Sequence, residues 1–162
     1  MKFLVTAFIS LFFSFHLTSQ IPQLWGMTYD GGASGNGGIF KINGDGTGFG
    51  NPFAFNSING SSPMGSLIQA SDGKLYGTTE WGGTSQFGVL FRFDPANNTQ
   101  TVVFNFNGIN GKNPFLGNKL IEATNGLLYG VTYQGGTNNY GIIFSFDPYT
   151  NVFTKVFDFN GL

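Results

Sequence analysis

The chain has no cysteine and a single histidine, His16, among its 162 residues. Structural zinc sites of the Cys/His type are therefore excluded, whereas the lack of disulfide bonds is compatible with either an oxidising or a reducing compartment. Charge is also scarce, because charged residues make up 9% of the sequence and the formal net charge is -1. No segment collects basic residues, so nucleic acid and anionic membrane surfaces are not expected as partners.

The first twenty residues have the pattern of an export signal. Lys2 supplies a positive start, residues 3–17 form an uncharged apolar run, and small residues precede a cleavage that we expect between Ser19 and Gln20. An uncleaved membrane anchor is the alternative, but it needs about 20 apolar residues and this run is shorter. We therefore predict a signal peptide at residues 1–19 and a secreted or cell-surface chain 20–162, with no stable membrane insertion after cleavage.

Glycine and aromatic residues are abundant, and they recur at a period of about 51 residues. Three copies begin near Leu24, Leu75 and Leu128, and the second spacing is two residues longer because of additional residues between Pro114 and Leu120. Each copy contains a Leu-Trp/Tyr-Gly motif, a glycine doublet and a Phe-x-Phe-Asn motif. The doublets are Gly31-Gly32, Gly82-Gly83 and Gly135-Gly136, and the Phe pairs are Phe53 and Phe55, Phe104 and Phe106, and Phe157 and Phe159.

The apolar residues within each copy alternate with a period of two, which is typical of β-strands. One unit is predicted to form four strands at residues 66–71, 75–79, 89–94 and 101–106, and the first copy lacks the first of these. Asp72-Gly73 and Asn125-Gly126 lie between apolar runs and predict hairpin turns with positive φ at both central residues. We interpret the alternating Phe residues as the core between stacked sheets, and we expect almost no helix after residue 20.

Four short strands in a repeat of about 50 residues are typical of a propeller blade. The stretch from Phe146 to Phe153 is similar to kelch blades, and residues 75–83 and 43–49 resemble the GloVer tandem repeat of choice-of-anchor bacterial surface proteins. The resemblance implies an exported repeat array that commonly ends in a C-terminal sorting or anchoring signal, and no such signal is visible here. We expect an all-β, β-propeller-like repeat fold of about three four-stranded blades. Its 11 strands are fewer than the roughly 16 of four blades, so we predict an incomplete propeller that self-associates through open blade edges.

Carboxylates are the side chains best suited to catalysis here, but most have simpler roles. Asp72, Asp94 and Asp147 occupy turn positions, and Asp158 lies opposite the Phe pair of its strand, which leaves Asp30, Asp45, Glu80 and Glu122. Asp30 and Glu80 precede glycine doublets and could form an acid pair across neighbouring blades. Residues 43–47 have calcium-like oxygen spacing but lack the bidentate Glu of an EF-hand, which favours a glycine-rich strand connection. No catalytic residue, metal site or cofactor is predicted.

Comparison of the three copies separates fixed positions from variable ones. The glycine of the Leu-Trp/Tyr-Gly motif and a following threonine (Thr28, Thr79 and Thr132) are retained, whereas the next two positions differ between copies. These variable positions are Tyr29 and Asp30, Glu80 and Trp81, and Tyr133 and Gln134. Exposed rings and amides suit sugar faces or extended peptides, so we predict a surface binding or adhesion module with its ligand at these six residues. The alternatives are an extracellular carbohydrate-active hydrolase or lyase whose catalytic residues lie partly outside this chain, and a structural spacer without a ligand.

Overall fold

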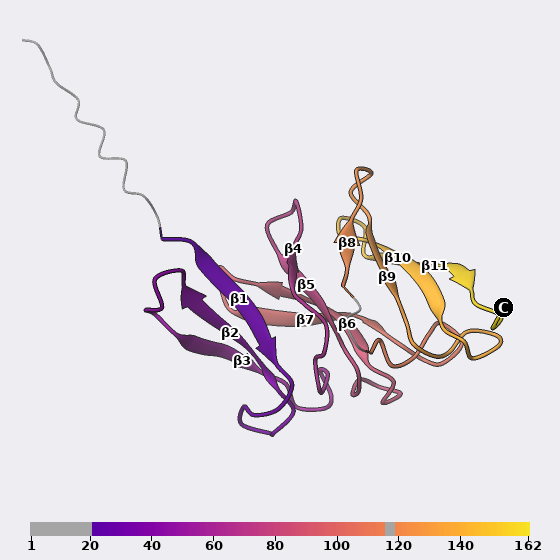
Figure 1. Cartoon of the computed structure of the whole chain (residues 1–162), viewed down its shortest axis with the longest axis horizontal. Coiled ribbons are helices and arrows are strands. Elements are labelled where there is room, and N and C mark those ends of the chain that lie inside the picture. The colour runs from indigo at the N-terminus through magenta and orange to yellow at the C-terminus, as the bar shows by residue number, and fades with distance from the viewer. Residues whose placement is uncertain (1–20, 116–118) are drawn as a thin grey trace, which may run out of the picture.

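A computed structural model describes residues 21–115 and 119–162 as three antiparallel sheets that follow one another along the molecule (Figure 1). The first sheet contains β1 (Gln23–Thr28), β2 (Gly38–Asn43) and β3 (Gly50–Ala54), and the second contains β4 (Ile68–Gln69), β5 (Leu75–Thr79), β6 (Val89–Asp94) and β7 (Thr99–Asn105). The third contains β8 (Ile121–Glu122), β9 (Leu128–Val131), β10 (Ile142–Asp147) and β11 (Val152–Asp158). The regular elements of the described residues are all strands, which confirms the all-β prediction. The predicted signal peptide lies outside the described residues, and so do residues 116–118 of the longer loop.

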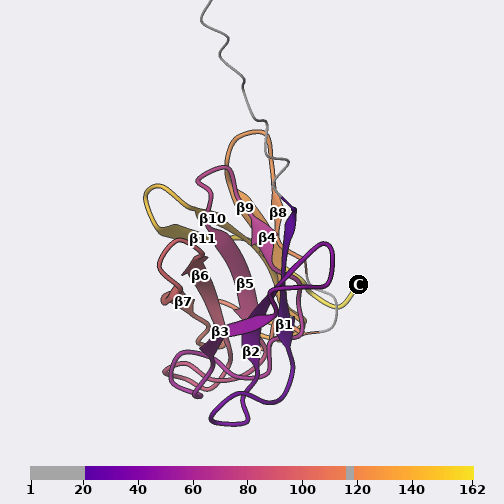
Figure 2. The same cartoon turned by 90° about the vertical axis from the view of Figure 1, so that its left-hand side faces the viewer.

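Each repeat forms one sheet, in which successive strands pair as neighbours, and we call these sheets the first, second and third blades. The blades overlap when the molecule is viewed along its length and do not close into a ring (Figure 2). The predicted incomplete propeller is therefore confirmed, including the missing strand of the first blade. The strand predicted at residues 66–71 is shorter than expected, because only Ile68 and Gln69 pair with β5. Residues 21–115 and 119–162 contain no helix with the length and hydropathy of a membrane span.

The Asp-Gly and Asn-Gly hairpins form, but their turn type differs from the prediction. Gly73 has a φ of 79° and donates its N–H to the Ala70 carbonyl at 2.9 Å, whereas Asp72 does not have positive φ. The Asp72 carboxylate accepts the Lys74 N–H at 2.9 Å instead. This arrangement is a three-residue loop closed by glycine in the left-handed region. Asn125 and Gly126 repeat it, with the Asn125 side-chain oxygen accepting the Leu127 N–H at 3.1 Å.

Two apolar cores lie between the blades, and the second blade contributes to both. Phe91 and Phe93 face the first blade, whereas Leu90 on the opposite side of the same strand is fully buried against the third. The sequence pattern assigned Phe91 and Phe93 to the core correctly, but it did not predict that the other face is covered as well. Because each blade has a neighbour on one or both sides, we call the side toward the preceding repeat its N-side face and the other its C-side face.

The retained glycine of the Leu-Trp/Tyr-Gly motif allows an aromatic ring to lie flat on the sheet. A Cβ atom on Gly77 would lie 2.7 Å from Cζ of Phe91, and Gly26 and Gly130 are covered in the same way by Phe40 and Phe144. A larger residue would therefore displace the ring that fills the N-side face. This packing explains why the glycine recurs in all three copies, although the backbone there is ordinary strand.

Candidate functional site

The six predicted ligand residues lie in the loops that directly follow β1, β5 and β9. These loops are held by the threonine that precedes each variable pair. The Thr79 hydroxyl donates to the Trp81 carbonyl at 2.8 Å and accepts the Val89 N–H at 3.2 Å. Thr132 makes the equivalent bonds to the Gln134 carbonyl and the Ile142 N–H, at 2.8 and 3.2 Å. The hydroxyl of the retained threonine thus fixes the loop backbone. These hydrogen bonds do not involve the variable side chains at the tip.

The segment 108–114, which we call the connector, joins the loops of the second and third blades. Asn113 donates its backbone N–H to the Phe87 carbonyl at 2.9 Å and accepts the Tyr133 N–H at 3.3 Å. Its side-chain amide also donates to the Glu80 carbonyl at 3.2 Å. Asn113 adopts a φ of 48°, which asparagine tolerates better than most residues. One buried residue therefore sets the spacing between the two loop tips.

Four of the six predicted residues meet in one hollow between the second and third blades. This interblade hollow has a volume of about 250 Å³ and is lined by Glu80, Trp81, Asn113, Phe115, Tyr133 and Gln134. Trp81 is 44% exposed and Tyr133 63% exposed. The rings of Phe115 and Tyr133 lie 5.9 Å apart and are tilted by 53°. Tyr29 and Asp30 of the first blade are exposed but do not line this hollow, so the structure brings together two of the three predicted pairs.

Glu80 is the buried ionisable group of the interblade hollow. It is only 8% exposed, and burial raises the pKa of its carboxyl above the ordinary value of 4.5. A side-chain hydrogen bond from Trp81 lowers the pKa and offsets part of this shift. Glu80 is the one carboxylate among the described residues that line the hollow, and Asp30 does not join it there. The predicted acid pair is therefore not formed at this position.

Asn113 and Phe115 line the hollow, but sequence reasoning did not select them. The repeat did contain a signal for the connector, since Gly60 and Gly111 are separated by the usual 51 residues, as are Pro63 and Pro114. The equivalent segment between the first two blades has the same role, because Ser62 donates to the Asn36 carbonyl at 3.0 Å and accepts the Glu80 N–H at 3.1 Å. The retained glycine and proline therefore mark a structural link that reaches the loop tips.

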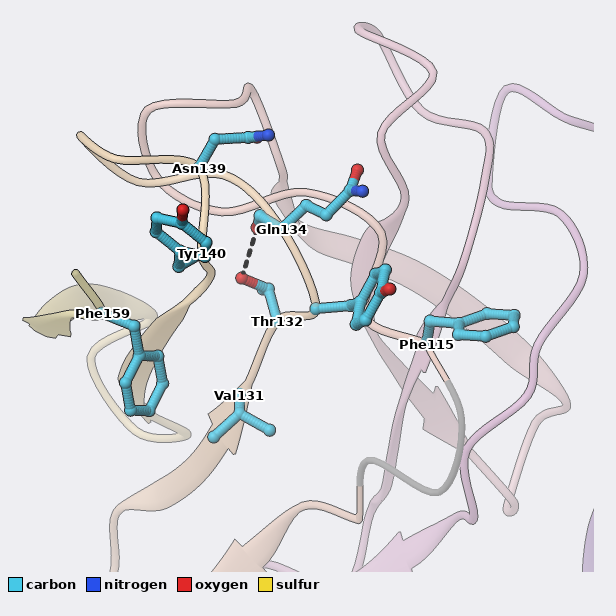
Figure 3. Close-up of a pocket in the computed structure, with 8 residues that line it drawn as sticks. Phe115, Val131, Thr132, Gln134, Asn139, Tyr140 and Phe159 are labelled. Atoms are coloured by element: carbon cyan, nitrogen blue, oxygen red, sulfur yellow. Dashed lines mark hydrogen bonds between the residues drawn. The ribbon is translucent and has the colours of Figure 1, made fainter. Parts of the chain in front are cut away.

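A larger hollow of about 740 Å³ shares Phe115, Tyr133 and Gln134 with the interblade hollow and extends to the C-side face of the third blade (Figure 3). Figure 3 shows Val131 and Phe159 on one side of it and Tyr140 on another, with Phe115 at the far end. The equivalents of Tyr140 and Phe159 in the second blade are Phe87 and Phe106, and there the connector and the third blade cover them. The part of this hollow at Tyr140 and Phe159 thus corresponds to a space that protein fills between the second and third blades.

The remaining carboxylates have structural partners. Asp94 and Asp147 accept the N–H groups of Ala96 and Tyr149, both at 2.9 Å, as the turn prediction requires. Asp45 accepts the Thr47 N–H at 3.0 Å and the Thr47 hydroxyl at 2.7 Å, and these bonds lower the pKa of Asp45. Its carboxylate therefore stabilises the strand connection. Within the described ranges no three His, Cys, Asp or Glu side chains are grouped closely enough to hold a metal ion.

Comparison with known protein families identifies a repeat family. The Gloeobacter/Verrucomicrobia repeat family matches residues 14–162, which include all three blades and begin inside the predicted signal peptide. No curated protein matches the chain. The match covers well over half of the sequence and agrees with the GloVer resemblance of the Leu-Tyr-Gly and Gly-Gly motifs. The chain therefore belongs to the Gloeobacter/Verrucomicrobia repeat family.

Proposed function

We propose that this protein is an exported binding module, secreted or displayed at the cell surface, whose ligand contacts the interblade hollow. The observation that carries the proposal is that variable loop tips from two repeats, those after β5 and β9, line the same hollow, while the residues that hold these loops are retained. Trp81, Phe115 and Tyr133 contribute three aromatic rings to this one hollow, and Glu80 and Gln134 contribute polar groups. A purely structural loop does not require aromatic and polar side chains to gather at positions that differ between otherwise similar repeats.

A glycan fits this site better than an extended peptide. Aromatic rings provide flat apolar area for sugar faces, and an amide and a carboxyl group give direction to hydroxyl groups. The volume of about 250 Å³ is below the roughly 300–1,000 Å³ of pockets that enclose a small molecule. We therefore expect one sugar unit to enter the hollow while the rest of the chain extends over the exposed rings of Trp81 and Tyr133.

Binding of residues 20–162 to a glycan array and to a peptide panel tests the proposal. We expect glycan binding that Trp81→Ala weakens about 30-fold, which corresponds to about 2 kcal/mol for a central aromatic anchor. Tyr149→Ala is the matched control, because Tyr149 is an exposed aromatic residue of the β10–β11 turn outside the hollow. Normal glycan binding by both Trp81→Ala and Tyr133→Ala would show that this hollow is not the site. Peptide binding without glycan binding would assign the site to peptides.

The raised pKa of Glu80 supports a second candidate, a carbohydrate-active enzyme in which Glu80 is the general acid. Such an enzyme needs a second carboxylate at the bound sugar, which this hollow does not supply, so a residue from outside the chain would complete it. Release of reducing ends from polysaccharides that is lost in Glu80→Gln would favour the enzyme. Binding without release, retained in Glu80→Gln, would favour the binding module.

A further inference from the structure

The two interfaces between blades are built in the same way. In each, the second Phe of the Phe-x-Phe motif packs edge-on against the Phe in the middle of the next blade. The ring centroids of Phe55 and Phe91 are 5.2 Å apart at an interplanar angle of 64°. Those of Phe106 and Phe144 are 5.6 Å apart at 62°. The corresponding residues at the two ends of the series are Phe159 on the C-side face of the third blade and Phe40 on the N-side face of the first.

The C-side face of the third blade exposes apolar residues whose equivalents in the second blade are covered. Phe157 is 52% exposed and Phe159 is 36% exposed, whereas Phe106, the equivalent of Phe159, is fully buried. Ile121, Val156 and Tyr140 are exposed on the same blade, and their equivalents Ile68, Val103 and Phe87 pack against the core between the second and third blades. The hollow of Figure 3 extends this surface, since Tyr140 and Phe159 line it. This face therefore has the composition of an interblade interface.

The N-side face of the first blade exposes the complementary residues. Leu24 is 55% exposed, whereas its equivalents Leu75 and Leu128 are buried. The ring of Phe40 covers Gly26, as Phe91 and Phe144 cover their glycines, and Phe49 lies 6.3 Å from Phe40. Phe40 and Phe49 correspond to Phe144 and Phe153 of the third blade, whose rings stack 5.1 Å apart. The first blade thus has, on its N-side face, the same aromatic pair that packs against the second blade when it is part of the third.

The pair Phe40 and Phe49 indicates which surface would pack against the first blade. Phe153 stacks on Phe104 with parallel rings 3.6 Å apart in the interface between the second and third blades. The second blade has Gln100 at the Phe153 position, so the first blade resembles the third more closely here than it resembles the second. Phe157, the equivalent of Phe104, and Phe49 are both strongly exposed. Phe157 and Phe49 therefore correspond to the two stacked residues, Phe104 and Phe153, and both are exposed at opposite ends of the same chain.

We propose that the C-side face of the third blade binds the N-side face of the first blade in a second copy of this chain. In this contact Phe159 packs against Phe40 and Phe157 stacks on Phe49 of the other copy. Because the two faces differ, the contact is heterologous and either closes into a ring or continues as a filament. Two copies of residues 20–162 supply six blades, within the range of about four to eight found in closed propellers. We therefore expect a closed dimer, held by blade faces rather than by strand edges alone.

Sedimentation of residues 20–162 over a concentration series, with two face variants, tests this arrangement. We expect the wild-type chain to form a dimer. Phe157→Asp blocks the C-side face and Phe49→Asp blocks the N-side face, so each variant alone is expected to lose the dimer. An equimolar mixture of the two retains one intact contact and is expected to form a mixed dimer. Tyr149→Asp, an exposed aromatic change on neither face, is expected to dimerise like the wild type.

Several results would overturn the proposal. A wild-type chain that stays monomeric, or a dimer that survives both Phe157→Asp and Phe49→Asp, would show that these faces do not associate. Loss of the dimer in only one variant, or failure of the mixture to associate, would show that the contact is not head to tail. Circular dichroism and melting establish that each variant is folded. Val156→Asp and Leu24→Asp replace any variant that is not, since they alter the same two faces.

Discussion

At the scale of the residue, the residues retained in every repeat hold the loop tips in place, and the variable residues face the solvent or the hollow. Thr79 is fully buried, and its hydroxyl is both a donor and an acceptor to the backbone of the loop that presents Trp81. Gly77 leaves space for the ring of Phe91, its partner on the adjacent strand of the same blade. The candidate site therefore depends on residues that do not line the hollow.

Replacement of Thr79 by valine is expected to destabilise the chain by about 1–3 kcal/mol, because it leaves the Val89 N–H and the Trp81 carbonyl without this partner at unchanged side-chain size. Urea unfolding of the two proteins measures the difference. Thr101→Val is the control, because Thr101 is exposed on β7 and little change is expected there. Equal stability of Thr79→Val and the wild type would mean that the hydroxyl does not hold the loop.

Glu80 makes stability depend on pH with a defined sign. Its pKa in the folded chain lies above the ordinary value of 4.5, so the folded state binds the proton more tightly than the unfolded state. This contribution favours folding at low pH and is lost as the pH rises through 4.5 toward the higher pKa of the folded state. Glu80→Gln is therefore expected to gain stability relative to the wild type over that rise, as measured by urea unfolding at several pH values.

Asp94 supplies the opposite control. A side-chain hydrogen bond from Lys74 and a backbone hydrogen bond from Ala96 lower its pKa below the ordinary 3.8. Its contribution is present above 3.8 and is lost as the pH falls through the lower pKa of the folded state. The difference in unfolding free energy between the wild type and Asp94→Asn should consequently shrink on acidification.

For Glu80, a difference in unfolding free energy between the wild type and Glu80→Gln that does not change with pH would contradict the burial of that carboxyl.

At the scale of the element, equivalent strands have different environments because their neighbours differ. Phe106 of the second blade and Phe159 of the third end the same motif and follow strands of the same length, β7 and β11. Phe106 is fully buried between two blades, whereas Phe159 is covered on one side only and is 36% exposed. Burial in this chain is thus decided by the next blade and not by the strand itself.

This difference predicts unequal effects of the same substitution. Phe106→Ala is expected to destabilise the chain by about 3–5 kcal/mol, as in other fully buried cores. Phe159→Ala is expected to cost about 1–2 kcal/mol, since part of that ring is already in contact with water. Unfolding at a dilution where the chain is monomeric measures both without a contribution from association. Equal losses would mean that Phe159 is packed within the single chain as fully as Phe106.

The alternation of apolar residues predicted the strands well, but it did not determine what lies on each side of them. Residues 75–79 and 89–94 were predicted with the bounds that β5 and β6 have. The burial of Leu90 was not predicted, because a period of two separates two faces without saying whether the second is covered. The turn at Asp72 also differs, since its carboxylate accepts the Lys74 N–H in place of a positive φ.

The candidate site could be predicted only in part for a related reason. Differences between repeats identified Glu80, Trp81, Tyr133 and Gln134, because variable positions on a fixed scaffold occur at loop tips. Phe115 reaches the same hollow through the connector, and no pattern within a single loop indicates that approach. Tyr29 and Asp30 belong to a repeat of the same kind, but the walls of this hollow come from the second and third blades.

At the scale of the whole molecule, the chain is a row of blades in which each contacts only its neighbours. The second blade is packed on both faces, and the first and third blades are each packed on one. In such an array stability is approximately the sum of the stability of each repeat and of each interface. The two interfaces can therefore be weakened separately by equivalent substitutions, Phe55→Ala for the first and Phe106→Ala for the second.

Hydrogen exchange should reveal this division. Phe55 contacts Phe91 across the first interface, so Phe55→Ala is expected to accelerate exchange of the amides in β1, β2 and β3. The amides of β8 to β11 should keep their protection, because the second interface is intact. Phe106→Ala should give the reverse pattern, since Phe106 contacts Phe144 of the third blade. The central strands β5 and β6 are expected to exchange slowest in both variants, because each variant leaves one face of the second blade covered. If either substitution instead accelerated exchange equally in all three blades, the chain would unfold as one cooperative unit and the interfaces would not be independent.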